Sequence, residues 1–113
     1  MNSSYLTAVA NDYSYAEVFA RSVRGCGRKG DVLFGLTTSG NSPNVLQAME
    51  VAREIGMITV GMTGETGGKL KGACTYLLNV PSRVTARIQE SHILIGHIVS
   101  ELVEARLFGP AEG

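Results

Sequence analysis

The sequence lacks the residues and segments that mark several large classes of protein. It has no tryptophan, and its two cysteines, Cys26 and Cys74, form no C-x-x-C pair and no cluster with histidine. A disulfide framework or an all-cysteine zinc site is therefore not indicated. No apolar run approaches the ~20 residues that a membrane span needs, and the polar N-terminus does not resemble a signal peptide. We expect a cytoplasmic protein that makes no membrane contact.

Net charge is lacking as well, because ten lysines and arginines balance ten aspartates and glutamates. Proteins that bind nucleic acid usually carry a basic surface, so this balance argues against a nucleic-acid partner and requires a local site for any anionic ligand. The 113 residues suit a single domain, and 44% hydrophobic residues are typical of a folded chain. A mean hydropathy of +0.11 without net charge predicts a homo-oligomer, since little repulsion keeps copies apart.

Short apolar runs alternate with longer amphipathic segments, and most of the fourteen glycines lie between them. This alternation predicts an α/β fold. The expected strands are residues 6–10, 32–36, 57–62 and 76–80, and the expected helices are residues 14–23, 43–55 and 85–107. The continuous apolar run over 32–36 is typical of a central parallel strand. With right-handed helical crossovers, these elements predict a three-layer α/β/α sandwich with a parallel sheet and a ligand crevice at the carboxyl ends of the strands.

Two of the expected helices carry further signals. The helix over 43–55 has Ser42 at its N-cap position, Pro43 at its first position and Gly56 at its end. The helix over 85–107 is apolar over more than half of its circumference, so one sheet face cannot cover it. We expect copies of the chain to associate through this last helix.

The strongest functional signal is the loop over residues 37–42, which reads Thr-Thr-Ser-Gly-Asn-Ser between an apolar strand and a helix. Four hydroxyls and the free N–H groups of the first helical turn meet there at the positive end of the helix dipole. That combination predicts a phosphate site, although it matches neither the Walker A motif nor G-x-G-x-x-G. A polar loop that only caps the helix is the alternative interpretation.

Two other segments could reach the same rim of the sheet. The glycine-rich segment 64–69 follows the next strand and could form a second wall of the crevice, but a solvated turn is the simpler explanation of its glycines. Asn11 and Asp12 follow the first expected strand, where they could bind sugar hydroxyls or cap the next helix.

The last helix carries the two histidines of the chain. His92 and His97 point about 140° apart on a helix, so they cannot act as an i, i+4 metal-ligand pair. A solvated side chain beside Glu101 is the simplest interpretation of His97. Gln89 lies two turns before His97 on the same helix, where both could contact a common ligand.

Taken together, residues 30–42, the segment 64–69 and the Arg-Ile-Gln-Glu helix with its histidines resemble the sugar isomerase (SIS) domain, and specifically the phosphoheptose isomerases. The resemblance extends over residues 6–109 and implies a flavodoxin-like α/β/α sandwich. It implies an isomerase that converts sedoheptulose 7-phosphate to D-glycero-D-manno-heptose 7-phosphate, a step toward lipopolysaccharide heptoses. It also implies zinc as cofactor and a homo-oligomer, which is a tetramer in the family.

The resemblance assigns roles to individual positions. Asn11 and Asp12 match an Asn-Asp pair that contacts the substrate. Gln89 matches a glutamine that touches both substrate and zinc, and His97 matches the zinc-ligating, proton-transferring histidine, so these two are the candidate catalytic and metal-binding residues. His92 matches no functional residue. The phosphate-binding loop is matched by Thr37, Thr38, Ser39 and Ser42.

The family's catalytic base, a glutamate, and its remaining zinc ligands belong to a region that would precede residue 6. We therefore expect residues 1–113 to be a single, N-terminally truncated SIS domain that alone neither retains stoichiometric zinc nor isomerises the sugar at a useful rate. A non-catalytic phosphosugar-binding module is one alternative, because the phosphate loop is whole. A protein-interaction module like the replication-initiator-associating relative is another.

Overall fold

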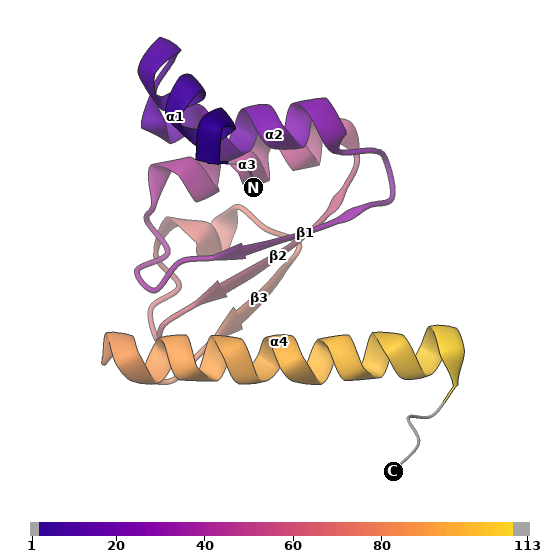
Figure 1. The fold of residues 1–113 in the computed structure, drawn as a ribbon. Helices are drawn as coiled ribbons and strands as arrows, with labels where there is room; N and C mark the ends of the chain where they lie inside the picture. Colours follow the sequence, from indigo (N-terminus) through magenta and orange to yellow (C-terminus); the bar gives the residue numbers. More distant parts are fainter. Residues whose placement is uncertain (1–2, 110–113) are drawn as a thin grey trace.

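The computed structural model describes residues 3–109 of the chain. Its elements are α1 (Ser3–Asp12), the 3-10 helix η1 (Tyr15–Glu17), α2 (Val18–Cys26), β1 (Val32–Leu36), α3 (Pro43–Ile55), β2 (Ile58–Thr63), the 3-10 helix η2 (Gly68–Gly72), β3 (Tyr76–Asn79) and α4 (Thr85–Phe108). Figure 1 shows three layers, with α2 and α3 on one face of the sheet and α4 on the other. The expected three-layer α/β/α sandwich with a parallel sheet is confirmed.

The three strands lie in the order β1-β2-β3, so β2 is central and β1 is an edge strand of the described sheet. The prediction that residues 32–36 form a central strand is therefore wrong for residues 3–109. The N–H of Ile58 donates to the carbonyl of Asp31, and the N–H of Thr37 donates to the carbonyl of Met62. Because successive residues of a strand direct their backbone groups to opposite edges, the even-numbered residues of β1 turn theirs to the open edge.

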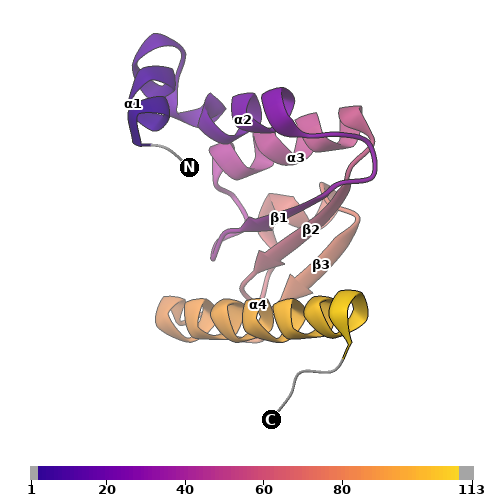
Figure 2. The same cartoon turned by 45° about the vertical axis from the view of Figure 1, so that its right-hand side comes forward.

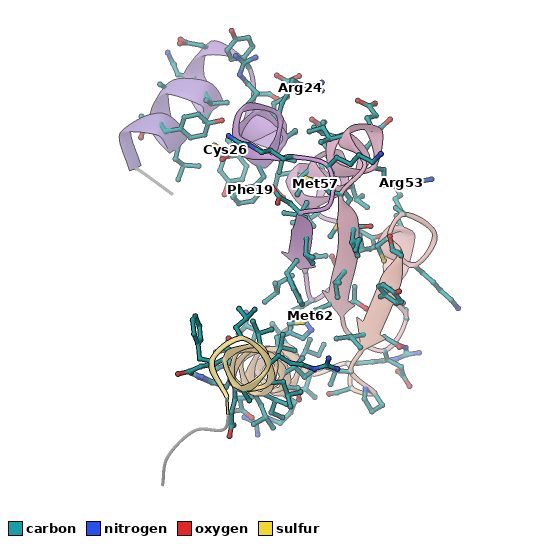
Figure 3. All side chains as sticks on the ribbon, turned by 90° about the vertical axis from the view of Figure 1, so that its right-hand side faces the viewer. Phe19, Arg24, Cys26, Arg53, Met57 and Met62 are labelled. Atoms are coloured by element: carbon teal, nitrogen blue, oxygen red, sulfur yellow. The ribbon has the colours of Figure 1, made fainter. Side chains whose placement is uncertain are left out.

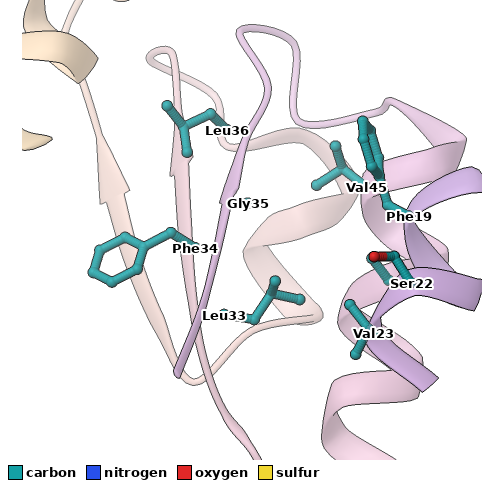
Figure 4. Close-up of a pocket in the computed structure, with 9 residues that line it drawn as sticks. Phe19, Ser22, Val23, Leu33, Phe34, Gly35, Leu36 and Val45 are labelled. Carbon is teal, nitrogen blue, oxygen red and sulfur yellow. The ribbon is translucent and has the colours of Figure 1, made fainter. Parts of the chain in front are cut away.

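β1 is apolar on both faces, although the described helices cover only one of them. Leu33 points toward α2 and α3, and a Cβ at Gly35 would collide with side chains of α3. Phe34 and Leu36 point the opposite way (Figure 4) and, with Val32, are 41–50% exposed. An apolar cavity of about 280 Å³ lies at this edge between β1 and the two helices. The uniformly apolar sequence of β1 thus reflects two apolar faces. A central position in the sheet would explain both faces, but an edge strand can have them too.

The expected strand over residues 6–10 is also wrong, since these residues belong to helix α1. Tyr5 and Val9 lie one turn apart on α1; Val9 is buried, and the Tyr5 hydroxyl donates to a backbone carbonyl of α2. The packing of α1 on η1 and α2 outweighs the weak strand preference of the segment. Asn11 and Asp12 therefore end a helix, and Figure 2 shows α1 beside α2, away from the sheet.

The helix expected over residues 43–55 is confirmed at both ends. α3 begins at Pro43 directly after Ser42 and ends at Ile55, and the next residue, Gly56, adopts the left-handed conformation with φ +93°. Its inward face supplies much of the core through Ala48, Met49, Val51 and Ala52. The other expected elements lie within a few residues of their predicted bounds, with η1 and α2 together replacing the helix over 14–23.

α4 crosses the second face of the sheet and is anchored near its N-terminal end. Ile88 and His92 are the buried residues of α4, and Figure 3 shows Met62 of β2 directed toward this helix. No helix within residues 3–109 combines the length and apolar character required to cross a membrane. Most of the large apolar side chains along the rest of α4 are exposed; these are Ile93, Leu94, Ile98, Leu102, Val103, Leu107 and Phe108.

Candidate functional site

The loop over residues 37–42 connects the carboxyl end of β1 to the start of α3, as the sequence predicted. Thr37 is buried and continues the pairing with β2 through its backbone N–H. Its hydroxyl shares a 2.7 Å hydrogen bond with the Ser42 hydroxyl and a 3.5 Å bond with the Ser39 hydroxyl. The fold therefore brings three hydroxyl groups together at the end of the strand.

Ser42 occupies the N-cap position of α3, but its side chain makes no capping hydrogen bond to the helix. Thr37 holds that hydroxyl instead. One first-turn donor is already used, because the N–H of Val45 donates to the Asn44 side chain. The hydroxyl cluster nevertheless lies at the positive end of the α3 dipole, which favours an anion site over a loop that only caps the helix.

A second loop, residues 64–69, packs directly against the first. The N–H of Gly64 donates to the carbonyl of Thr38 (3.0 Å), and the N–H of Lys69 donates to the side-chain oxygen of Asn41 (2.9 Å). These bonds place the segment beside the first loop, where Gly64, Glu65 and Thr66 line a second hollow. Features of the solvated turn are present as well, because Glu65 and Thr66 are exposed and Gly67 has a φ of +77°.

Glycines allow the two loops to approach this closely. Gly40 has φ +75°, and a Cβ on it would collide with the backbone carbonyl of Gly67. Gly68 has φ +54°, and a Cβ there would collide with the carbonyl of Ser39. Both contacts are with backbone atoms, which cannot rotate away as a side chain can. The geometry of the first loop therefore depends on the second.

A cavity of about 440 Å³ lies between the first loop and α4. Thr37, Thr38 and Ser42 line it from the loop, and Gln89 and His92 line it from the helix. Its volume falls within the range of roughly 300–1,000 Å³ that is usual for small-molecule sites. The structure thus brings four of the residues selected from the sequence to one cavity at the carboxyl end of the sheet, and adds His92.

A second hollow of about 260 Å³ lies between the two loops and the start of α4, and Ser39 lines this one. Thr38 lines both spaces. Within the second hollow, Arg83 Nε and Glu65 Oε2 form an ion pair at 2.7 Å, with the Arg83 side chain 80% exposed. An exposed pair of this kind contributes little to stability.

Three residues selected from the sequence line neither of these two spaces. His97 is exposed on α4, two turns beyond Gln89. Asn11 and Asp12 are exposed at the end of α1, which packs on η1 and α2 rather than at the rim of the sheet. The suggestion that this pair follows a strand at the rim is wrong, and its assignment as a substrate contact remains a prediction.

His92 is the residue that the sequence analysis passed over. It is only 3% exposed, and its Nε2 lies 3.0 Å from the backbone carbonyl of Thr63 at the end of β2. The i, i+3 spacing from Gln89 could have identified it, because residues three apart share one face of a helix.

Comparison with known proteins identifies the family. The SIS domain family matches residues 1–64, which is more than half of the chain. The chain belongs to the SIS domain family. A phosphoheptose isomerase of Mycobacterium bovis is 58% identical to it over 111 residues, covering 98% of this chain and 57% of that protein. One of Aneurinibacillus thermoaerophilus is 50% identical over 107 residues, covering 95% of this chain and 54% of that protein.

Solved structures agree with this assignment. The phosphoheptose isomerase of Neisseria gonorrhoeae superposes with a TM-score of 0.84 at 48% identity, covering 87% of this chain and 56% of that one. That of Francisella tularensis gives 0.83 at 39% identity, covering 86% of this chain and 52% of that one. This SIS domain chain spans a little over half the length of the relatives it matches.

Proposed function

We propose that this chain forms the phosphosugar-binding part of a phosphoheptose isomerase that converts sedoheptulose 7-phosphate to D-glycero-D-manno-heptose 7-phosphate. The observation that carries the proposal is the hydroxyl cluster at the N-terminus of α3, which opens on the cavity shared with Gln89. The named relatives, at 50–58% identity, favour this function over a non-catalytic binding or protein-interaction module. A cytoplasmic homo-oligomer is part of the same proposal.

The loop binds the phosphate group through dipoles rather than through charged side chains. The residues that line the 440 Å³ cavity include no lysine or arginine. The Thr37 and Ser42 hydroxyls share one hydrogen bond, so one of their two protons is left to donate to a phosphate oxygen at the positive end of α3. Thr38 and Ser39 extend this set of hydroxyls toward the second loop.

The sugar then extends from the loop toward α4, where the Gln89 amide can donate to and accept from its hydroxyls. An aldose–ketose shift moves a proton between adjacent carbons through an enediolate, which needs a base and stabilisation of the developing oxyanion. The described residues that line the cavity include no carboxylate, and His97 lies outside it. This chain therefore supplies substrate binding and orientation, and His97 enters the proposal only through the family resemblance.

Zinc does not fit the described residues alone. Catalytic zinc usually takes three protein ligands, whereas no three His, Cys, Asp or Glu side chains gather among residues 3–109. Gln89 and His97 would supply two donors, a neutral amide and one imidazole. Zinc binding by this chain therefore remains an expectation drawn from the family.

Calorimetric titration with inorganic phosphate tests the binding site. We expect Ser39→Ala combined with Ser42→Ala to weaken phosphate binding by about tenfold, since two hydroxyl hydrogen bonds are lost. Ser100→Ala, a serine on the exposed side of α4, serves as the matched control and should leave the affinity unchanged. Equal affinities for the double variant and the unmodified chain would place the phosphate elsewhere and contradict the proposal.

A further inference from the structure

We propose that His92 determines how the phosphosugar is oriented in the cavity, by accepting a hydrogen bond from a sugar hydroxyl at Nδ1. This inference rests on the proposed function and adds a residue to which neither the sequence analysis nor the family resemblance assigned a role. It follows from the burial of the imidazole, its single partner and the cavity it lines.

The hydrogen bond to Thr63 fixes the tautomer of His92. A backbone carbonyl can only accept, so the Nε2 that lies 3.0 Å from the Thr63 oxygen carries the proton. In the neutral ring, Nδ1 then bears a lone pair and acts as an acceptor. The burial of Thr63, at the end of β2, makes the bond well shielded from water.

Nδ1 has no hydrogen-bond partner among the described residues. Every side-chain nitrogen or oxygen that is fully enclosed within residues 3–109 has such a partner, so Nδ1 is not fully enclosed. His92 is nevertheless 97% buried and lines the 440 Å³ cavity together with Gln89 and Thr37. An acceptor that is almost withdrawn from water and adjoins a cavity is well placed to meet a ligand donor.

An acceptor at this position interacts differently with the two ends of a phosphosugar. A phosphate monoester dianion has oxygens that only accept, and a lone pair directed at them would repel them. Sugar hydroxyls can donate. His92 therefore favours the orientation in which the phosphate lies at the loop over 37–42 and the sugar lies against α4.

A purely structural role would be to fasten α4 to β2 through the Thr63 bond. His92→Gln separates the two roles, because a glutamine amide can reach the Thr63 carbonyl in place of Nε2–H while leaving no acceptor at the position of Nδ1. His92→Asn makes the opposite change. Its amide lies near the position of Nδ1, but the side chain is too short to hydrogen-bond to the Thr63 carbonyl.

The experiment measures the affinity of each variant of the 113-residue chain for sedoheptulose 7-phosphate and for inorganic phosphate. We expect His92→Gln to weaken binding of the sugar phosphate about tenfold, the effect of one lost hydrogen bond in a buried site, and to leave the affinity for phosphate and the melting temperature unchanged. Equal losses for both ligands, or no loss for either, would overturn the role of His92. If the unmodified chain binds neither ligand, the proposed function fails as well.

A second measurement does not depend on the variants folding. In the unmodified chain, nitrogen-15 spectra report the Nδ1 resonance of His92 directly. We expect sedoheptulose 7-phosphate to shift this resonance to lower frequency, as acceptance of a hydrogen bond requires, and inorganic phosphate to leave it in place. A shift caused equally by both ligands would assign His92 to the phosphate group and contradict the proposed orientation.

Discussion

Gly40 lies at the contact between the two loops of the site, with no room for a side chain. Its φ of +75° and its approach to the Gly67 carbonyl both exclude a Cβ. We expect Gly40→Ala to lower the free energy of unfolding by at least about 2 kcal/mol, from backbone strain and a backbone collision together. Urea denaturation followed by circular dichroism measures this loss.

Gly25→Ala is the matched control for that variant. Gly25 lies within α2, and a Cβ there would meet nothing within 4 Å. Because Gly25 lies in the last turn of α2, where the preference for alanine is weaker than in a helix interior, we expect Gly25→Ala to raise the free energy of unfolding by no more than about 0.5 kcal/mol. If Gly40→Ala unfolds at the same urea concentration as the unmodified chain, the two loops are not in the contact that the structure shows.

Single residues also show how far the sequence predicts the site. Thr37 and Ser42 were recognised because a hydroxyl-rich loop between a strand and a helix has a known physical use, and the structure brings both to the cavity. The exposure of His97 and the burial of His92 depend on how α4 sits on the sheet. Apolar residues cover more than half of the circumference of α4, so its sequence does not indicate which part of that wide arc faces the sheet.

At the scale of elements, α3 and α1 show why prediction succeeds or fails. α3 has a proline at its first position and a left-handed glycine at its end, and both are local signals. α1 has no such signals, and its helical state is accompanied by packing on η1 and α2, which follow it in the chain. The same holds for β1, which is an edge strand of the described sheet. The residues of a strand do not indicate whether one or two other strands pair with it.

The anchoring of α4 leads to a prediction about its two halves. Ile88 is 3% exposed, and its Cδ1 lies against Gly64 of the second loop, whereas Leu102 is 61% exposed. We expect Ile88→Ala to cost about 2–5 kcal/mol of unfolding free energy. Leu102→Ala, measured by the same urea titration in dilute protein, should change it by less than about 0.5 kcal/mol. A large loss from Leu102→Ala would show that its part of the helix is covered in solution.

At the scale of the whole molecule, the exposed apolar side chains of α4 predict self-association. Light scattering across a dilution series should give a mass above the 12.0 kDa of one chain. Leu94→Glu with Leu102→Glu should shift the mass toward one chain, because both side chains are about 60% exposed and charges there oppose apolar contact.

Lys71→Glu is the matched control, since it changes the net charge by the same two units as the double variant but lies in η2, away from α4. Its mass should equal that of the unmodified chain. A stable monomer for the unmodified chain would contradict the prediction.

The close packing of the two loops also determines when conformational entropy is lost. Contacts between backbone atoms order the hydroxyls of the first loop as the chain folds, so a ligand bound as proposed would meet groups that are already in position. Little of its interaction energy would then be spent on ordering the protein, which would favour binding of a dianion in a cavity that no lysine or arginine lines. Because the loops join β1 to α3 and β2 to η2, a phosphosugar bound there would stabilise the entire folded unit by mass action.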